Sequence, residues 1–299
     1  MCGIVGLFLK NPKLQPQLGR HLSAMLVEMT GRGPDSAGIA VYREPVKDAL
    51  KLTLFHADDS YDWDGLAKAL KKRFGAKPEI AVRASHARLT VKAGADEVQA
   101  FLAAEAPDVR VMSAGDTIEI YKEMGLPERV IARFDLRHIE GTHALGHTRM
   151  ATESAVTTAH SHPFSTGRDL CLVHNGSLSN HNRLRAVLKR DGIAFQTDND
   201  SEVAAGYLAS RLRHGRSLTQ ALEDALADLD GFYTFAIGTR DGFAVLRDPV
   251  GCKPAVLAET GDWVAMASEY RAIAMLPGAE AARVWEPVPA KVYAWERAH

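Results

Sequence analysis

The sequence predicts an α+β fold in which stacked β-sheets are covered on the outside by helices. Two observations carry this prediction. Short apolar segments separated by tight turns are typical of strands, and they lie at 232–239, 242–248, 255–259 and 263–268. Ahead of them, LTQALEDALADL at 218–229 has the apolar spacing of an amphipathic helix. Sheets stacked face to face with helices outside account for both patterns.

The composition is that of a globular protein. Of the 299 residues, 46% are hydrophobic and 24% are charged, which is enough for a sizeable core in one or two domains. The net charge is −1 and no lysine or arginine run stands out, so neither a nucleic-acid nor a membrane partner is expected. No apolar run approaches about 18 residues, and the N-terminus lacks the pattern of a signal peptide. Three distant cysteines favour a reducing cytoplasm over a disulfide framework or a zinc site.

The first 42 residues predict a strand, a helix and a second strand. CGIVGLF at 2–8 is apolar and interrupted by glycine, as in a buried strand. The segment GRGPDSAG at 31–38 indicates turns before the strand IAVY at 39–42. A helix is expected at about 16–29, with Leu18, Leu22, Met25, Leu26 and Met29 on one face.

Residues 49–113 read as a strand, a helix, two strands, a helix and a strand. This β-α-β-β-α-β order is that of a ferredoxin-like unit. We therefore expect a small α+β subdomain at about 49–113, within an insertion that covers 45–140.

Sequence patterns typical of strands and helices continue after the insertion. Gly242 after Asp241 indicates a hairpin between two of the late strands. Further strands are expected at 143–152 and 169–178, and further helices at about 180–191 and 202–213.

Cys2 follows the initiator methionine, and this position has two interpretations. A free cysteine is usually a small, inert residue of the core. A small second residue, however, permits removal of Met1, which would leave Cys2 with a free α-amine. The pKa of an α-amine is about 7.7–8.0, so this amine can act as a general base for the thiol of the same residue. If Met1 is retained, the mechanism has no base.

Several short motifs occur in a fixed order along the chain. They are CGIVG at the start, RGPDSAG at 32–38, GHTRMAT at 146–152, HSHPF at 160–164, VHNG at 173–176, DSE at 200–202, RDPVGCKP at 247–254 and ASEYRAI at 267–273. Together they resemble the class II glutamine amidotransferases, whose fold is the N-terminal-nucleophile hydrolase αββα sandwich. The resemblance covers residues 2–42 and about 141–275. It implies a glutamine-hydrolysing domain over 2–299, interrupted by the insertion, with Cys2 as the nucleophile.

The resemblance implies roles for the residues that hold the substrate. Arg149 matches the arginine that binds the α-carboxylate of glutamine, for which a guanidinium fork is well suited. Asn175 and Gly176 match the oxyanion hole, although Asn-Gly alone would indicate only a tight turn. Asp200 matches the aspartate that pairs with the substrate ammonium. Its alternative role is that of a helix N-cap, which Asp198 could also supply.

The same resemblance implies a second group of residues around the site. Thr152 and His162 are expected in the wall of the substrate pocket. Arg32, Asp35 and Ser36 are expected to shape the loop beside the nucleophile. The histidines of HSHPF are expected as pocket wall rather than as metal ligands, so no metal site is predicted.

The stretch 113–136 resembles stand-alone amidotransferase subunits of glutamate-synthase-type complexes, most of all that of N-methylglutamate synthase, which joins methylamine to glutamate. This implies a hetero-oligomer in which glutamine or glutamate reacts through a Cys2 thioester, and ammonia or an amine passes to a synthase subunit. FMN and an iron–sulfur cluster would belong to partner chains, because three scattered cysteines cannot hold a four-cysteine cluster. No cofactor is expected in this chain. Two alternatives stay open: the glutaminase subunit of an ordinary glutamate synthase, and a catalytically silent assembly or regulatory subunit that retains Met1.

Overall fold

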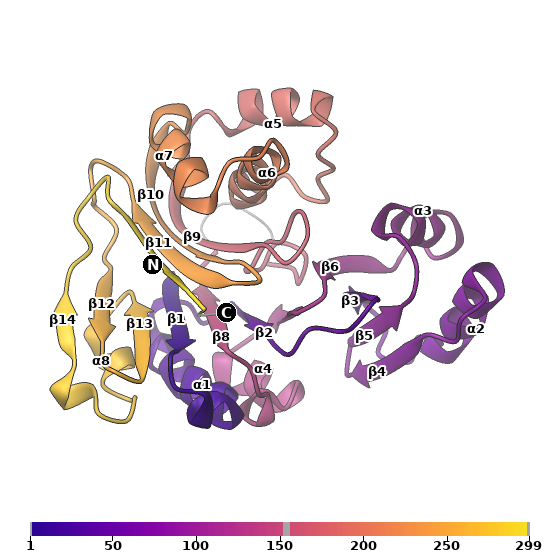
Figure 1. The fold of residues 1–299 in the computed structure, drawn as a ribbon, viewed down its shortest axis with the longest axis horizontal. Coiled ribbons are helices and arrows are strands. Elements are labelled where there is room, and N and C mark those ends of the chain that lie inside the picture. Colours follow the sequence, from indigo (N-terminus) through magenta and orange to yellow (C-terminus); the bar gives the residue numbers. More distant parts are fainter. Residues whose placement is uncertain (1, 152–155, 298–299) are drawn as a thin grey trace.

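The chain folds into four layers, in the order helices, sheet, sheet, helices (Figure 1). The computed structural model describes residues 2–151 and 156–297. The larger sheet has seven strands and the sheet stacked on it has four. A third sheet with two helices of its own lies to one side of this sandwich. The layered α+β fold predicted from the sequence is confirmed.

The seven-stranded sheet has the order β14-β12-β13-β1-β8-β2-β7, and every neighbouring pair of strands is antiparallel. Its central strand β1 is buried on both faces. Val5 and Leu7 pack against helices, whereas Ile4 and Phe8 pack against the second sheet, because alternate side chains of a strand point to opposite faces. The strands of this sheet are β1 (Gly3–Leu9), β2 (Ser36–Tyr42), β7 (Ile118–Met124), β8 (His143–Arg149), β12 (Val256–Glu259), β13 (Trp263–Ala267) and β14 (Arg283–Trp285).

The second sheet has the order β15-β11-β10-β9 and is also antiparallel. Its strands are β9 (Cys171–Leu178), β10 (Gly231–Gly238), β11 (Gly242–Arg247) and β15 (Val292–Glu296). The hairpin predicted at Gly242 joins β10 to β11.

Helices cover the outer face of each sheet (Figure 1). The second sheet is covered by α5 (His181–Arg190), α6 (Asp200–Arg213) and α7 (Leu218–Asp228). The larger sheet is covered by α1 (Leu18–Glu28), α4 (Pro127–Arg133) and α8 (Tyr270–Ile273). Short 3₁₀ turns are η1 (Pro12–Gln17), η2 (Thr30–Arg32), η3 (Leu136–His138) and η4 (Ala279–Ala281). All five residues predicted for the apolar face of the first helix are fully or almost fully buried.

The third sheet contains the β-α-β-β-α-β order predicted for residues 49–113. Its elements are β3 (Leu50–Phe55), α2 (Trp63–Phe74), β4 (Glu79–Arg83), β5 (His86–Val91), α3 (Ala95–Glu105) and β6 (Arg110–Gly115). The strands pair in the antiparallel order β4-β5-β3-β6. Strand β7 and helix α4 also lie within the interval 45–140, but they belong to the larger sheet and its helical layer. The domain boundaries themselves stay a prediction.

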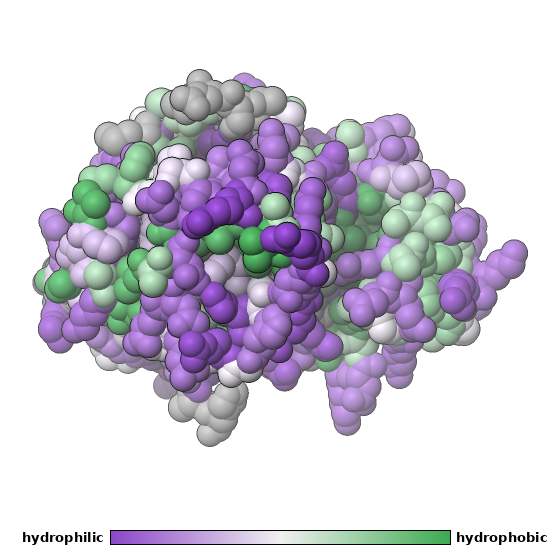
Figure 2. Space-filling model, turned by 90° about the horizontal axis from the view of Figure 1, so that it is seen from above, coloured by the Kyte–Doolittle hydropathy of each residue, from purple (hydrophilic) through white to green (hydrophobic). Residues whose placement is uncertain are grey.

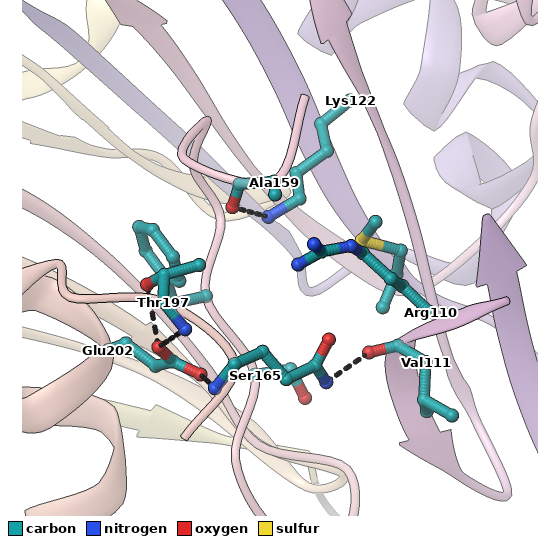
Figure 3. Close-up of a pocket in the computed structure, with 10 residues that line it drawn as sticks. Arg110, Val111, Lys122, Ala159, Ser165, Thr197 and Glu202 are labelled. Carbon is teal, nitrogen blue, oxygen red and sulfur yellow. Dashed lines mark hydrogen bonds between the residues drawn. The ribbon is translucent and has the colours of Figure 1, made fainter. Parts of the chain in front are cut away.

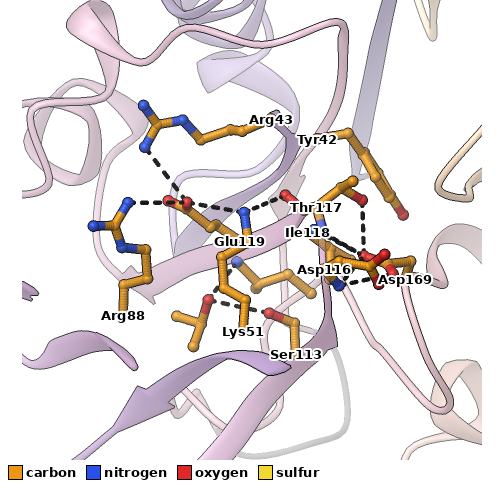
Figure 4. Close-up of polar contacts among 12 residues, drawn as sticks. Tyr42, Arg43, Lys51, Arg88, Ser113, Asp116, Thr117, Ile118, Glu119 and Asp169 are labelled. Carbon is orange, nitrogen blue, oxygen red and sulfur yellow. Dashed lines mark hydrogen bonds and ion pairs between the residues drawn. The ribbon is translucent and has the colours of Figure 1, made fainter. Parts of the chain in front are cut away.

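A group of charges around one buried ion pair joins the third sheet to the larger sheet (Figure 4). We call Lys51, Glu119, Arg43, Arg88 and Tyr121 the interface cluster. The Nζ atom of Lys51 lies 3.3 Å from Oε1 of Glu119, and both side chains are almost fully buried. Arg43 and Arg88 approach the same oxygen at 3.4 and 3.9 Å, and the Tyr121 hydroxyl donates to Oε2. The attraction of these cations lowers the pKa of Glu119 against the opposing effect of burial.

The outer surface is mixed in character. Figure 2 shows mostly hydrophilic residues on the face seen from above, with smaller hydrophobic areas between them. Within residues 2–151 and 156–297, no helix combines the length and the apolar character needed to cross a membrane.

Candidate active site

A cleft of about 630 Å³ opens where the two stacked sheets and helix α6 meet. Its wall is built from segments that are far apart in the sequence. These are the residue before β1, the end of β8, the middle of β9, the start of α6 and the loop after β11. The residues that line it include Cys2, Arg32, Arg149, Met150, His162, His174, Asn175, Gly176, Asp198, Asp200, Ser201, Phe232 and Lys253.

Cys2 lies at the edge of this cleft, directly before the central strand. Its Sγ atom is 3.4 Å from the backbone nitrogen of Met150, which donates to it. Its carbonyl oxygen accepts two hydrogen bonds, from Nε of Arg32 at 2.9 Å and from Nδ2 of Asn175 at 3.1 Å. Arg32 is held in turn by Glu269 at 2.7 Å. The backbone of Cys2 is therefore fixed while its thiol faces the cleft.

Arg149 is the last residue of β8 and lines the cleft with only 5% of its surface exposed. Its backbone pairs with Ser36 at the start of β2, and its carbonyl accepts a hydrogen bond from the backbone of Asp35 at 3.1 Å. The carboxylate of Asp35 accepts from the backbone of Ala151 at 2.8 Å. Asp35 and Ser36 thus contact the backbone at the end of β8, and Arg32 contacts Cys2 itself.

Asn175 and Gly176 lie on β9, across the cleft from β8. Gly176 has φ +147°, a backbone conformation that favours glycine. A Cβ atom there would lie 1.9 Å from the carbonyl oxygen of Phe232, so a side chain cannot be accommodated. Asn175 is buried, and its amide nitrogen faces Cys2. The geometry thus brings an amide donor and a backbone N–H to the same wall as the thiol.

Asp200 is the first residue of helix α6, and its Oδ2 atom accepts from the backbone of Leu178 at 2.9 Å. The N-cap is Asn199, whose side chain accepts from the backbone of Ser201 at 2.8 Å. The capping role considered for Asp200 or Asp198 therefore belongs to Asn199. Asp198 instead pairs with Nε2 of His160 at 2.9 Å.

Three buried histidines lie in or directly behind the wall of the cleft, and we call them the histidine cluster. They are His147, His162 and His174. The rings of His147 and His162 stack with centroids 4.0 Å apart. Nε2 of His162 and Nδ1 of His174 both lie 2.9 Å from Oγ of Ser201. Burial is the main cause that lowers the pKa of each of these histidines, and for His147 the pKa falls to about 3. The three rings are therefore neutral at physiological pH.

Only His162 of this cluster is predicted from the motifs. A signal for His147 is nevertheless present, because it stands two residues before Arg149 and therefore faces the same side of strand β8.

Lys122 supports the segment that carries His162, and Figure 3 shows its Nζ atom directed at the carbonyl of Ala159, 3.4 Å away. It lies on β7, almost fully buried, and its ammonium donates to the carbonyls of Ser161 at 2.7 Å and Pro163 at 3.2 Å. Burial lowers the pKa of Lys122 to about 7. Gly38 on the neighbouring strand makes room for this segment, since a Cβ atom there would lie 2.3 Å from the carbonyl of His162.

Glu202 fixes the chain that leads into helix α6 (Figure 3). Its carboxylate accepts from the backbone nitrogens of Gln196 at 2.7 Å and Thr197 at 2.8 Å, and from the hydroxyl of Thr197 at 2.6 Å. Neither Lys122 nor Glu202 stands out in the sequence as a support of the site.

The structure leaves two of the expectations open. Thr152, predicted in the pocket wall, lies outside the described residues. Among the residues that are described, no group of three or more His, Cys, Asp or Glu side chains is arranged to hold a metal ion.

The αββα sandwich, with a cysteine directly before its central strand, is the arrangement of the N-terminal-nucleophile hydrolases. The fold matches that of the glutamine phosphoribosylpyrophosphate amidotransferase from B. subtilis, with a TM-score of 0.60 at 21% identity. The match covers 98% of this chain and 47% of that protein.

The sequence comparisons define the family. Residues 147–275 match the model of the glutamine amidotransferase domain. The chain is 57% identical over 297 residues to the glutamine amidotransferase-like protein GlxB of Rhizobium meliloti (strain 1021), covering 99% of this chain and 98% of GlxB. It is 33% identical over 280 residues to a putative glutamine amidotransferase of Methanothermobacter thermautotrophicus, covering 90% and 92% of the two chains. The chain therefore belongs to the glutamine amidotransferase family. Domains of this family carry no cofactor.

Proposed function

We propose that this chain hydrolyses the γ-amide of glutamine with the thiol of Cys2. The observation that carries the proposal is the convergence of four kinds of group on one cleft. They are a thiol at Cys2, a guanidinium at Arg149, the donors of Asn175 and Gly176, and a carboxylate at Asp200. A substrate with an α-carboxylate, an α-ammonium and a side-chain amide is complementary to this set.

Each group has a defined part in the proposed reaction. Arg149 binds the α-carboxylate and Asp200 the α-ammonium, which brings the γ-carbonyl to the thiol. After removal of Met1, the α-amine of Cys2 accepts the thiol proton as sulfur attacks the carbonyl carbon. Asn175 and Gly176 donate to the oxyanion that forms. The C–N bond then breaks, ammonia leaves with the transferred proton, and water hydrolyses the thioester to release glutamate.

The narrower proposal concerns the destination of the nitrogen. We propose that the chain is the amidotransferase subunit of a multi-subunit, glutamate-synthase-like enzyme of the cytoplasm, of the N-methylglutamate synthase type. The resemblance of the stretch 113–136 and of the insertion supports this subunit type. In that setting the same clamp would hold glutamine or glutamate. Ammonia or methylamine would pass to or from a synthase subunit that holds FMN and an iron–sulfur cluster.

The intact mass of the purified protein tests the nucleophile directly. We expect a mass without Met1, and a single adduct at Cys2 after treatment with a diazo-ketone analogue of glutamine. A mass that retains Met1, with no adduct at Cys2, would exclude the glutaminase and favour a silent assembly or regulatory subunit. Release of glutamate from glutamine, followed with and without methylamine, then separates hydrolysis from transfer to methylamine.

A further inference from the structure

We propose that His147 is a positioning residue that fixes the orientation of the Asn175 amide, so that its N–H group faces the nucleophile. This inference rests on the proposed glutaminase. It gives a function to a buried histidine that touches neither the thiol nor the cleft surface, since His147 is absent from the cleft lining and only 1% exposed.

The hydrogen bonds of Asn175 determine which way its amide points. The side-chain atom 3.1 Å from the carbonyl oxygen of Cys2 must be the amide nitrogen, because a carbonyl can only accept. The amide oxygen of Asn175 then lies 3.1 Å from Nε2 of His147. Since that oxygen can only accept, Nε2 of His147 must carry the proton. The neutral ring therefore has its proton on Nε2 and a bare Nδ1.

The reverse orientation of the Asn175 amide would break both contacts. It would place the amide oxygen against the carbonyl oxygen of Cys2, and the amide nitrogen against the N–H of His147. Two acceptors or two donors that face each other lose their hydrogen bonds, and buried polar groups without partners are strongly unfavourable. A reversed amide would also present oxygen to the developing oxyanion and would repel it. His147 thus disfavours the one orientation of Asn175 that would oppose catalysis.

The surroundings of His147 keep its ring in place. The ring stacks on His162, and Oγ of Ser201 holds His162 from the other side. Burial lowers the pKa of His147 to about 3, so the ring does not acquire a second proton in the working pH range of a cytoplasmic enzyme. Among the described residues, Nδ1 of His147 has no hydrogen-bond partner, so a proton moved from Nε2 to Nδ1 would be a buried donor without an acceptor. The neutral ring therefore keeps its proton on Nε2.

Three variants at position 147 distinguish the effect of losing the hydrogen-bond donor from the effect of changing the packing of the side chain. In His147→Gln the amide nitrogen stands at the place of Nε2 and can still donate, whereas in His147→Asn it stands nearer the place of Nδ1. His147→Leu has no donor. We expect kcat for glutamine hydrolysis to fall about 10–100-fold in the Leu and Asn variants, as misplaced catalytic groups do. KM should change less than about threefold, and His147→Gln should recover most of the activity.

The rate of alkylation of Cys2 by iodoacetamide, mapped by peptide mass, serves as the control. Alkylation needs no oxyanion hole, so it should be the same in all four proteins if they are folded. If His147→Leu keeps the wild-type kcat, or if His147→Gln is as impaired as His147→Leu with normal alkylation, the positioning role is wrong. A wild-type protein that alkylates at Cys2 but releases no glutamate would instead overturn the glutaminase proposal, and the inference with it.

Discussion

The interface cluster and the histidine cluster are both polar groups with buried centres, but the first consists of paired charges and the second of neutral rings. The interface cluster keeps its charges, because Glu119 has Lys51 beside it and further cations behind it. In the histidine cluster, burial keeps the rings neutral. The first cluster joins two sheets, and the second lies in and behind the wall of an open cleft.

This difference suggests that the interface cluster serves the stability of the fold and the histidine cluster serves the cleft. The charges of the interface cluster pair with one another across two sheets. Neutral groups beside the cleft add no charge to it, and in the proposed reaction the charges that bind the substrate are those of Arg149 and Asp200. We therefore expect changes in the cleft to reduce activity and changes in the interface cluster to reduce stability.

The largest effect is expected from Cys2→Ala. Removal of the nucleophile should lower glutamine hydrolysis by about 10⁴-fold or more. The free energy of unfolding, measured with urea, should change by less than about 1 kcal/mol, because the side chain of Cys2 is only partly buried and faces the cleft. Cys252→Ala, at an exposed cysteine, is the matched control and should keep full activity. An equal loss of activity in both variants would contradict the proposal that Cys2 is the nucleophile.

Glu119→Gln should show the reverse behaviour. It leaves the buried ammonium of Lys51 without its carboxylate, and breaking a buried pair typically lowers stability by about 3–5 kcal/mol. Urea denaturation of the variant measures this loss, with Glu140→Gln at an exposed glutamate as control. Glutamine hydrolysis at a temperature where both proteins are folded should stay near the wild-type rate.

A second substitution makes the test of the interface cluster sharper. Lys51→Met in the background of Glu119→Gln removes the unpaired charge, and it should restore much of the lost stability. If the double variant is less stable than Glu119→Gln alone, the attraction between the two charges is not what holds the sheets together.

Asn175→Ala tests the side-chain amide donor in the cleft, and its expected effect on activity is smaller than that of Cys2→Ala. Loss of one oxyanion donor should reduce kcat about 10²–10³-fold, or about 2.7–4 kcal/mol of transition-state stabilisation. KM should change little, because the donor acts on the transition state. Steady-state kinetics distinguishes this result from a binding role, in which KM would rise at constant kcat.

The strands and helices that carry motifs are predicted well from the sequence, because their patterns are local. The alternation in CGIVGLF and the helical spacing after it predict β1 and α1, and VHNG places Asn175 on β9. The motif order also indicates which residues meet in the cleft, although not how they are oriented.

Strand β7 shows what local patterns cannot predict. Its sequence IEIYKEM places a glutamate and a lysine inside a strand, which suggests an exposed surface. Both side chains are buried, because Glu119 meets Lys51 and Lys122 meets the carbonyls of Ser161 and Pro163. These partners lie far away in the sequence, so only the tertiary structure explains the burial. The same holds for His147, whose partner is 28 residues away on the other sheet.

Lys122 gives the smallest and most specific prediction, because it is a buried amine held by carbonyls rather than by a carboxylate. Its pKa is lowered to about 7 in the folded chain, whereas an unfolded chain keeps a lysine protonated up to about 10.4. Between these values the unfolded state binds more protons, so the contribution of Lys122 to stability must rise with pH. Relative to Lys122→Met, the wild type should gain up to about 1.4 kcal/mol per pH unit above pH 7. Urea denaturation of both proteins at pH 7, 8 and 9 measures this gain, with Lys72→Met as the exposed control. A difference that stays constant with pH would mean that the ammonium is as stable in its buried position as in water, and the carbonyls of Ser161 and Pro163 would then replace hydration completely.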